Sequence, residues 1–361
     1  MEMEQLLELS VKSEASDLHI MPELAPLLRI HGNLSPLKEA PTFSSAEAKR
    51  LIYSVMTEEQ QKTFESDLVF EMGLAILNVG NFRVSVFHQM NGVAAVFRVI
   101  PAKVPTFEEL GLPPVLKSLL GLSHGLILVA GPTGSGKSTT LAAMIDYINA
   151  TQSCNIITIE DPIEFIHENK KSVFNQLQVH RDTTDFSAAL RASLRQDPNV
   201  ILLGELRDLE TMRLALTAAE TGHLVLGTLH AVSAPLAINR FADVFPSEEK
   251  NRVRNLLSET LQGVVCQTLV KKISGGRAAA FEVMLVTPPI RHFIRQDMVA
   301  HMESAMQMSI GKGMCTMESY LHELVAKRVI NQMVAESVMA SRGQYKDEKE
   351  NIPPKKKKLW R

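Results

Sequence analysis

The sequence predicts an α/β protein with two domains, and three observations support that prediction. The chain has 361 residues, 45% of them hydrophobic, which is enough for about two domains with cores of their own. Between residues 119 and 229, short apolar runs alternate with helical stretches, as is typical of a mainly parallel sheet covered by helices. Four prolines and one glycine between Pro101 and Pro114 separate this region from an N-terminal part of different character.

Residues 1–100 are expected to form an α+β domain, because apolar alternation and turn residues recur there at short intervals. The predicted elements are, in order, a helix near 6–11, a strand at 16–20, a hairpin that turns at Gly32 and Asn33, a helix from 44 to about 56, and antiparallel strands at 82–87 and 93–100.

The rest of the chain is expected to comprise a linker at 101–116, a second domain at 117–340 and a basic tail at 341–361. Within the second domain, the pattern from 247 to 341 is read as mostly helical. The stretch from residue 344 to the last residue carries a charge of +4, and the remainder carries −6. We expect this tail to be disordered. Its lysines at 355–358 are either solvated or able to contact anionic lipid or nucleic acid.

Composition and charge argue against several classes of protein. The net charge of −2 gives no general case for nucleic-acid binding. The three cysteines are isolated from one another, so neither a disulfide framework nor a structural zinc site is expected. The acidic start lacks the pattern of a secretory signal peptide, and no apolar run approaches the roughly 20 residues that span a bilayer. We therefore expect a cytoplasmic protein that meets a membrane only through partners.

A strand, a glycine-rich loop and a helix follow one another between residues 126 and 145. The loop has the form GxxxxGKS, in which glycines allow backbone N–H groups to surround phosphates without Cβ clashes. The helix N-terminus adds partial positive charge. We expect Lys137 to reach the β- and γ-phosphates and the Ser138 hydroxyl to bind Mg²⁺. The predicted nucleotide-binding residues of this loop are Gly131, Pro132, Thr133, Gly134, Ser135, Gly136, Lys137, Ser138 and Thr139.

Two acidic clusters each follow an apolar, strand-like run. Glu160, Asp161 and Glu164 follow the first run, and Glu205 follows the second. Ligands in open parallel sheets bind outside the carboxyl ends of the strands, so both clusters are expected near the phosphate loop. Glu205 is predicted to serve the metal, usually through water. Each acid of the first cluster could instead belong to a solvated turn.

Two histidines, His223 and His230, bracket a third apolar run. Their odd spacing points them to opposite faces of a regular strand, which makes them poor joint metal ligands. Each could be a hydrogen-bonded core or rim histidine. A histidine at a strand end near phosphates could instead sense the γ-phosphate.

Four segments together resemble the secretion ATPase superfamily. They are residues 131–139, 159–165 (IEDPIEF), 194–208 (LRQDPNVILLGELRD) and 221–231 (TGHLVLGTLHA), and they match the Walker A, Asp box, Walker B and His box of that family. Within the superfamily the chain resembles the PilT-like retraction ATPases of type IV pili, over about residues 1–335. The four motifs in this order and spacing are highly specific to the superfamily.

The resemblance implies a PAS-like N-terminal domain, a RecA-like ATPase domain with C-terminal helices, and a ring of six subunits. It implies ATP and Mg²⁺ bound between the domains, with Glu164 as the glutamate that polarises water and Glu205 supporting the metal. Glu160 belongs to the matching Asp box, and His223 and His230 match the His-box pair. Arg83 and Arg98 match arginines supplied to the nucleotide by an adjacent subunit.

The function that the resemblance implies is ATP-driven pilus retraction and twitching motility. Force would pass to an inner-membrane platform protein, and a paralogous retraction ATPase is a further partner that the resemblance allows. Three alternatives stay open. A motor for pilus assembly or type II secretion usually carries a four-cysteine zinc insert, and three cysteines cannot supply it. An accessory ring that only binds nucleotide would not need the intact site residues. A nucleic-acid motor would need a basic stripe with interleaved aromatics.

Overall fold

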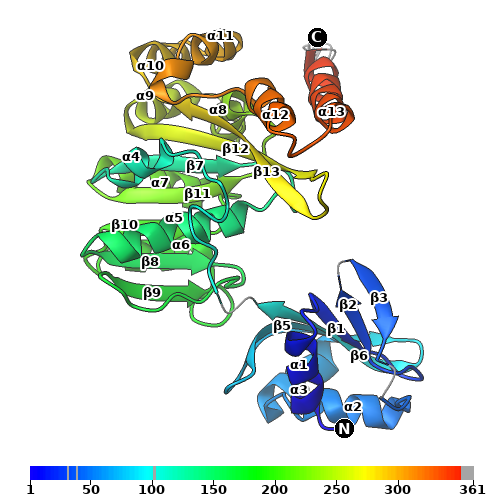
Figure 1. Cartoon of the computed structure of the whole chain (residues 1–361). Helices are drawn as coiled ribbons and strands as arrows, with labels where there is room; N and C mark the ends of the chain where they lie inside the picture. Colours follow the sequence, from blue (N-terminus) through cyan, green and yellow to red (C-terminus); the bar gives the residue numbers. More distant parts are fainter. Residues whose placement is uncertain (31, 38–39, 101–102, 351–361) are drawn as a thin grey trace, which may run out of the picture. The chain divides into compact units, whose positions relative to one another are not determined.

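The computed structural model describes residues 1–30, 32–37, 40–100 and 103–350, with side chains described as far as Gly343. The chain divides into two compact units: residues 1–104 with 164–166 form the first, and the other residues from 105 onward form the second. Figure 1 shows both as mixed α/β structures, which confirms the predicted fold class. Within the described part of the chain, none of the helices has the length and hydropathy that a membrane span requires.

In its described residues, the first unit comprises a six-stranded antiparallel sheet and three helices. The strands lie in the order β3-β2-β1-β6-β5-β4. Its helix α2 begins with a capping box, because the Ser44 hydroxyl accepts from the Glu47 N–H while the Glu47 carboxylate accepts from the Ser44 N–H. The elements are α1 Met3–Lys12, β1 Asp17–Ile20, β2 Leu27–Ile30, β3 Asn33–Pro36, α2 Ser45–Tyr53, α3 Glu58–Asp67, β4 Val69–Ile76, β5 Gly80–Gln89 and β6 Gly92–Ile100.

One face of this sheet is buried against the helices. Phe82, Val84 and Phe97 are fully buried there, and they alternate along β5 and β6 with Arg83 and Arg98, which lie on the other face. The predicted hairpin and strand pair in this unit are confirmed. The sequence analysis missed α3 and β4, whose residues show little apolar periodicity.

The second unit is built on a seven-stranded sheet in the order β13-β12-β7-β11-β10-β8-β9. All neighbouring strands are parallel except the β12–β13 hairpin. The elements are α4 Leu116–Leu120, β7 Gly125–Ala130, α5 Lys137–Thr151, β8 Asn155–Glu160, β9 Val173–Gln178, α6 Phe186–Ser193, β10 Val200–Leu203, α7 Leu209–Glu220, β11 Leu224–Leu229, α8 Ala234–Asp243, α9 Lys250–Thr260, β12 Leu261–Lys271, β13 Arg277–Leu285, α10 Pro288–Arg295, α11 Met302–Gln307, α12 Met317–Ala326 and α13 Gln332–Glu350, with short 3₁₀ turns at Val299–His301 and Ile310–Lys312.

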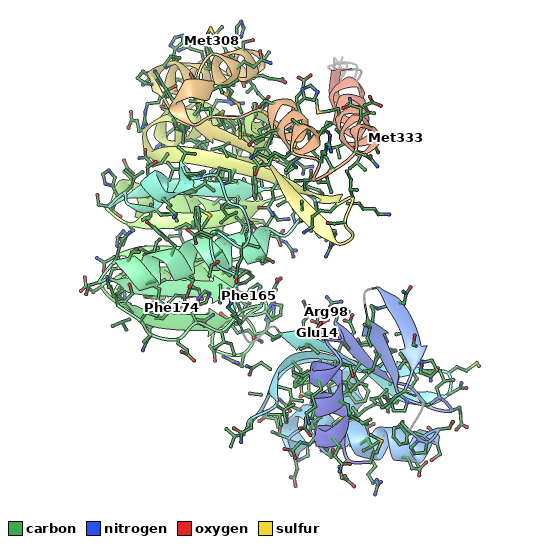
Figure 2. The ribbon with its side chains drawn as sticks, in the orientation of Figure 1. Glu14, Arg98, Phe165, Phe174, Met308 and Met333 are labelled. Atoms are coloured by element: carbon green, nitrogen blue, oxygen red, sulfur yellow. The ribbon has the colours of Figure 1, made fainter. Side chains whose placement is uncertain are left out.

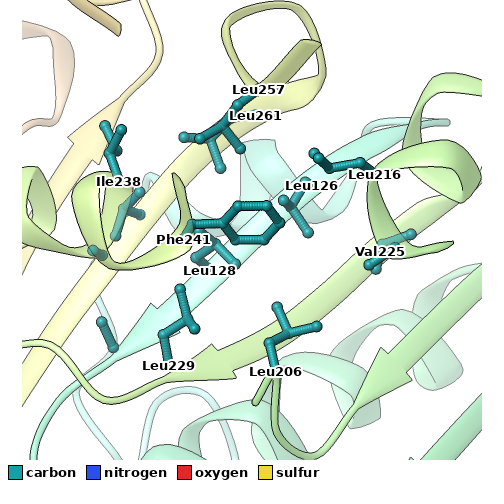
Figure 3. Close-up of a cluster of buried hydrophobic side chains, with 14 of the residues drawn as sticks. Leu126, Leu128, Leu206, Leu216, Val225, Leu229, Ile238, Phe241, Leu257 and Leu261 are labelled. Carbon is teal, nitrogen blue, oxygen red and sulfur yellow. The ribbon is translucent and has the colours of Figure 1, made fainter. Parts of the chain in front are cut away.

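Helices cover both faces of this sheet, so the strands are apolar without alternation. Along β7, Leu126 and Leu128 belong to one core while Ile127 and Val129 belong to the other. Phe241 of α8 lies fully buried in the first of these cores, among leucines from the sheet and neighbouring helices (Figure 3). The central strands are thereby fixed from both sides, and their carboxyl ends lie at one edge of the sheet.

Three expectations about the organisation of the chain need correction. The segment 101–116, expected to be a linker, packs into the second unit over much of its length, since Phe107, Leu112 and Leu116 are buried in its core. The burial of these apolar side chains holds the segment against the second unit, although prolines and a glycine interrupt it. The segment 247–341, expected to be mostly helical, contains the β12–β13 hairpin, whose continuous apolar run lacks the alternation of a half-exposed strand.

The third correction concerns the start of the tail. Helix α13 continues to Glu350, whereas disorder was expected from residue 341. This stretch is rich in Lys, Glu and Gln, which have good helix propensity, and Arg342 anchors it through a buried ion pair with Glu282 at 2.6 Å. The lysine run at 355–358 lies outside the described residues.

Candidate nucleotide-binding and catalytic site

The phosphate loop follows the buried strand β7 at its carboxyl end. Gly131 is the first loop residue, and it has a positive φ of 156°. A Cβ on Gly131 would lie 2.5 Å from both the Gln267 carbonyl oxygen and the Ser135 Oγ, so only glycine fits where the loop passes β12. The close approach folds the loop back over the end of the sheet.

The loop ends where α5 begins. Gly136 is the N-cap residue of α5 in the left-handed conformation, at a φ of 87°, so the first N–H groups of the helix point into the loop. The Lys137 ammonium donates to the carbonyl oxygens of Gly131 and Pro132, each at 3.0 Å. The Ser135 hydroxyl is buried and has no hydrogen-bond partner among the described residues. An orphaned donor and a cation among backbone N–H groups suit a phosphate.

Gln267 supports this loop from beneath, and the sequence analysis missed it. It lies on β12 with 1% of its surface exposed, and its Nε2 donates to the Ser135 carbonyl oxygen at 2.6 Å. Only the fold brings the two residues together, because 132 positions separate them in the sequence. Its amide thus ties the middle of the phosphate loop to the neighbouring strand.

Glu205 lies just beyond the carboxyl end of β10, as predicted. Its Oε1 is 3.0 Å from the His230 Nε2 and 2.5 Å from the Arg207 Nε. The hydrogen bond to Glu205 raises the pKa of Arg207, which therefore stays charged. The Thr228 hydroxyl on β11 donates to the Gly204 carbonyl oxygen at 2.5 Å and so fixes the turn that carries Glu205.

His230 follows β11 immediately, at the same edge of the sheet as the phosphate loop. His230 and the loop residue Thr133 line one cavity of about 230 Å³. The parallel pairing of β11 with β7, in which Leu229 lies opposite Ala130, explains this placement. The structure thus brings His230, Glu205 and the phosphate loop together.

His223 lies elsewhere, and its predicted place at the nucleotide needs correction. It precedes β11 at the opposite edge of the sheet, where its carbonyl accepts from the Gly125 N–H and its Nδ1 is 3.0 Å from the Ala218 carbonyl oxygen. Six strand residues, about 20 Å, separate it from His230. Within this chain His223 closes the start of a strand and is not part of the phosphate site.

The first acidic cluster follows β8. The Glu160 carboxylate accepts from the Thr158 hydroxyl at 2.7 Å and from the Gln176 Nε2 at 3.2 Å, so local side chains hold it at the end of its strand. Glu164 is exposed in the segment after this strand, next to the buried Ile163 and Phe165. The Glu164 carboxylate is thus accessible in the segment that follows β8.

Arg83 and Arg98 lie opposite each other in the register of β5 and β6 in the first unit. Arg83 pairs with the exposed Glu71 at 2.8 Å, and Arg98 pairs through its Nε with the buried Asp17 at 2.9 Å. The labelled Arg98 projects from the sheet on the side away from the helices (Figure 2). Both guanidinium groups therefore belong to one solvent-facing surface.

A scan against family models matches residues 2–351 to the type II/IV secretion system protein family. The chain belongs to this family. It is 53% identical to the type IV pilus retraction ATPase PilT of Pseudomonas aeruginosa, over 92% of this chain and 96% of that protein. It is 46% identical to a twitching motility protein of Neisseria gonorrhoeae, over 84% of this chain and 82% of that protein.

A solved structure supports the same assignment. The crystal structure of the pilus retraction motor PilT with bound ADP matches with a TM-score of 0.89 and 43% identity, and the match covers 94% of this chain and 97% of that one. The predicted resemblance to the secretion ATPases is confirmed. The similarity extends over both units and includes all four motifs on which the prediction rested.

One further cation lies beside the loop of this secretion ATPase. Arg240 on α8 is exposed and lines the same cavity as Pro132, Thr133 and His230. Its sequence position gave no signal, because Arg240 lies nine residues beyond the His box in an ordinary amphipathic helix. Helix α8 begins at Ala234, shortly after β11 ends at Leu229, and this connection brings Arg240 beside the loop.

Proposed function

We propose that this chain is the ATP-hydrolysing motor subunit of the machine that retracts type IV pili. The observation that carries the proposal is the meeting of Lys137, Glu205 and His230 at one edge of the sheet, in a chain 53% identical to a pilus retraction ATPase over nearly its whole length. The reaction is hydrolysis of ATP to ADP and phosphate. It supports twitching motility, and the protein works in the cytoplasm against the inner membrane.

Each residue of the site has a proposed part in that reaction. The loop residues 131–139 hold the phosphates, with Lys137 as a mobile positive charge. The hydroxyl of Ser138 and the carboxylate of Glu205 are oxygen ligands of the type that Mg²⁺ prefers. The ion pairs of Glu205 with Arg207 and His230 both use Oε1, so Oε2 would be available to a metal-bound water. Bound Mg²⁺ would neutralise the charge that develops on the phosphates. Glu164 orients the attacking water, and Glu160 braces the turn before it.

The active form is proposed to be a ring of six copies. Residues 1–100 act as a PAS-like domain and residues 117–340 as a RecA-like ATPase domain with C-terminal helices. Arg83 and Arg98 of one subunit stabilise the transition state on its neighbour, an effect typically worth about 10³–10⁵ in rate. Closure of the domains on ATP and opening on product release would pass force to an inner-membrane platform protein. A paralogous ATPase of the same machine could share the work.

A cell-based test uses Lys137→Ala as the only copy of the gene. The change removes the charge of the phosphate loop and leaves the core untouched, so the expected result is many surface pili and no surface motility. Lys250→Ala, which alters only a surface pair with Asp243, is the matched control and should behave as wild type. Bald cells would refute retraction and favour assembly or secretion. Wild-type behaviour would mean that the chain is an accessory ring subunit.

Two assays on the purified protein test the finer parts of the proposal. Phosphate release should require Mg²⁺ and stop when the metal is chelated. Lys137→Ala subunits and Arg98→Ala subunits should each be strongly impaired alone. Mixing them should restore activity, because some sites then combine an intact Lys137 with an intact Arg98 from the neighbour. Failure to recover any activity in mixed rings would contradict the role of the arginine across subunits.

A further inference from the structure

A row of charged side chains crosses the solvent-facing side of the first unit's sheet. Arg29, Asp17, Arg98 and Arg83 lie directly opposite one another on the adjacent strands β2, β1, β6 and β5. Asp17 is the single carboxylate within this row of three arginines. Since side chains directly opposite each other on one face interact, the row is one connected set of charges.

Asp17 differs from its neighbours in being buried. It is 5% exposed, whereas the Arg98 side chain is 66% exposed. One oxygen of Asp17 accepts from the Arg98 Nε at 2.9 Å, and the other lies 3.6 Å from the Arg29 Nε. The Ser16 hydroxyl also donates to Asp17, at 2.8 Å. A carboxylate held this way has little freedom to move.

The use of Nε by Asp17 has a consequence for what Arg98 can bind. A guanidinium group has five N–H donors, and Asp17 takes the one nearest the stem. The terminal nitrogens carry the other four N–H groups, and the end-on pair, one from each terminal nitrogen, points away from the stem and from the Nε that Asp17 binds. Two parallel donors in a fixed plane are the geometry that suits a phosphate oxygen pair.

Arg83 provides an internal comparison on the neighbouring strand. It bonds Glu71 through a terminal nitrogen, Nη2, at 2.8 Å, and the Glu71 side chain is 56% exposed. An exposed pair of this kind is screened by water and contributes little. The same row thus presents one arginine that is fixed from below and one that is only loosely held.

We propose that Asp17 is a positioning residue for catalysis, which holds the Arg98 guanidinium with its terminal nitrogens facing a phosphate of the nucleotide. The inference rests on the proposed function, in that Arg98 must act on nucleotide bound by another subunit. Asp17 itself touches neither nucleotide nor metal. Its effect on hydrolysis therefore has to pass entirely through Arg98.

The test is a double-mutant cycle on the full-length ring, with ATP turnover and thermal unfolding measured for each variant. Asp17→Asn keeps the size of the side chain and is tolerable when buried, so unfolding should change little. Its kcat should fall roughly tenfold with KM nearly unchanged. In the Arg98→Ala background, Asp17→Asn should have no further effect on kcat, because the group through which it acts is gone. Glu71→Gln is the matched control and should lose less than about twofold.

The outcomes separate this proposal from the one on which it rests. Full activity of Arg98→Ala would refute the proposed role of Arg98 in hydrolysis, and the positioning role of Asp17 with it. A strongly impaired Arg98→Ala with measurable residual turnover, together with a fully active Asp17→Asn, would overturn only the positioning role. Equal losses from Asp17→Asn with and without Arg98 would mean that Asp17 acts on the fold. If Asp17→Asn does not fold, Asp17→Glu, which retains the charge but moves it by one methylene, enters the same cycle.

Discussion

Replacing Gln267 by leucine should weaken nucleotide binding while leaving the stability of the fold nearly unchanged. Leucine preserves the apolar contacts and approximate size of the side chain but cannot donate to the Ser135 carbonyl oxygen. That hydrogen bond is 2.6 Å long and lies beneath the phosphate loop. Ser135 itself is 2% exposed, so its carbonyl would be left without an evident substitute partner.

The magnitude follows from the two ends of the Gln267 amide. Leaving a buried carbonyl unsatisfied costs about 1–3 kcal/mol, and this cost falls on the loop conformation that binds phosphate. The other end of the amide, Oε1, already lacks a hydrogen-bond partner among the described residues, so its removal relieves a buried polar atom. In the free energy of unfolding, the cost of the unsatisfied Ser135 carbonyl is offset by the removal of the unpaired Oε1. In the free energy of nucleotide binding, only the cost to the loop remains. We therefore expect the affinity for ATP and ADP to fall roughly 5- to 100-fold.

The assay is calorimetric titration of the purified protein with ADP, alongside urea unfolding without nucleotide. Thr268→Val is the matched control, because Thr268 is the next residue on the same strand, is only partly buried and points to the opposite face. An unchanged affinity in Gln267→Leu at unchanged stability would refute the reasoning, since it would mean that the loop needs no support from β12. A large loss of stability together with the loss of affinity would also refute the reasoning, because it would show that removing Oε1 does not offset the unsatisfied carbonyl.

Three further predictions concern the fold. Phe241→Ala should destabilise the protein by about 3–5 kcal/mol in urea unfolding, because the ring is fully buried, whereas Ile310→Ala at an exposed position should cost less than about 1 kcal/mol. Burial lowers the pKa of His167 to about 4, so the unfolded chain binds the proton more strongly than the folded chain. The free energy of unfolding should therefore rise with pH between about 4 and 6.5, by up to about 3 kcal/mol. His167→Gln should flatten that part of the stability profile. Arg342→Met should cost about 3–5 kcal/mol by leaving the buried Glu282 unpaired, and adding Glu282→Gln should restore most of the lost stability, both measured by thermal unfolding.

The parts of the site that the sequence could predict are those fixed by neighbouring residues. The strand, loop and helix around Lys137 follow one another without interruption, so glycine conformation and helix polarity determine the local geometry. Glu205 was predictable because a carboxyl strand end in a parallel sheet has only one edge to face. The same rule excludes His223, which precedes its strand. The spacing between the two histidines could not show at which end of the strand each one lies, and both lie outside β11.

The parts that could not be predicted depend on contacts between distant segments. Gln267 is one polar residue in an apolar run, and nothing in its surroundings in the sequence relates it to Ser135. Phe107 and Leu112 lie among prolines, whose turn-forming character outweighed the apolar side chains in the prediction. In each case the decisive interaction is burial against a strand or helix far away in the chain, and apolar burial overrides local propensity.

Gln267 and Asp17 show a shared arrangement at the two proposed halves of the catalytic site. In each, a buried polar side chain on a strand anchors a group for which we propose a contact with the nucleotide: the phosphate loop through Ser135, and the guanidinium of Arg98. Donors that are already oriented do not have to reorganise during reaction, which is the main source of electrostatic catalysis. Conservative changes at the buried anchors should then lower nucleotide affinity or rate more than stability, whereas changes in the apolar core, such as at Phe241, should do the reverse. Parallel measurement of turnover and unfolding for Asp17→Asn and Phe241→Ala would contradict this division if the two variants lost both quantities in the same proportion.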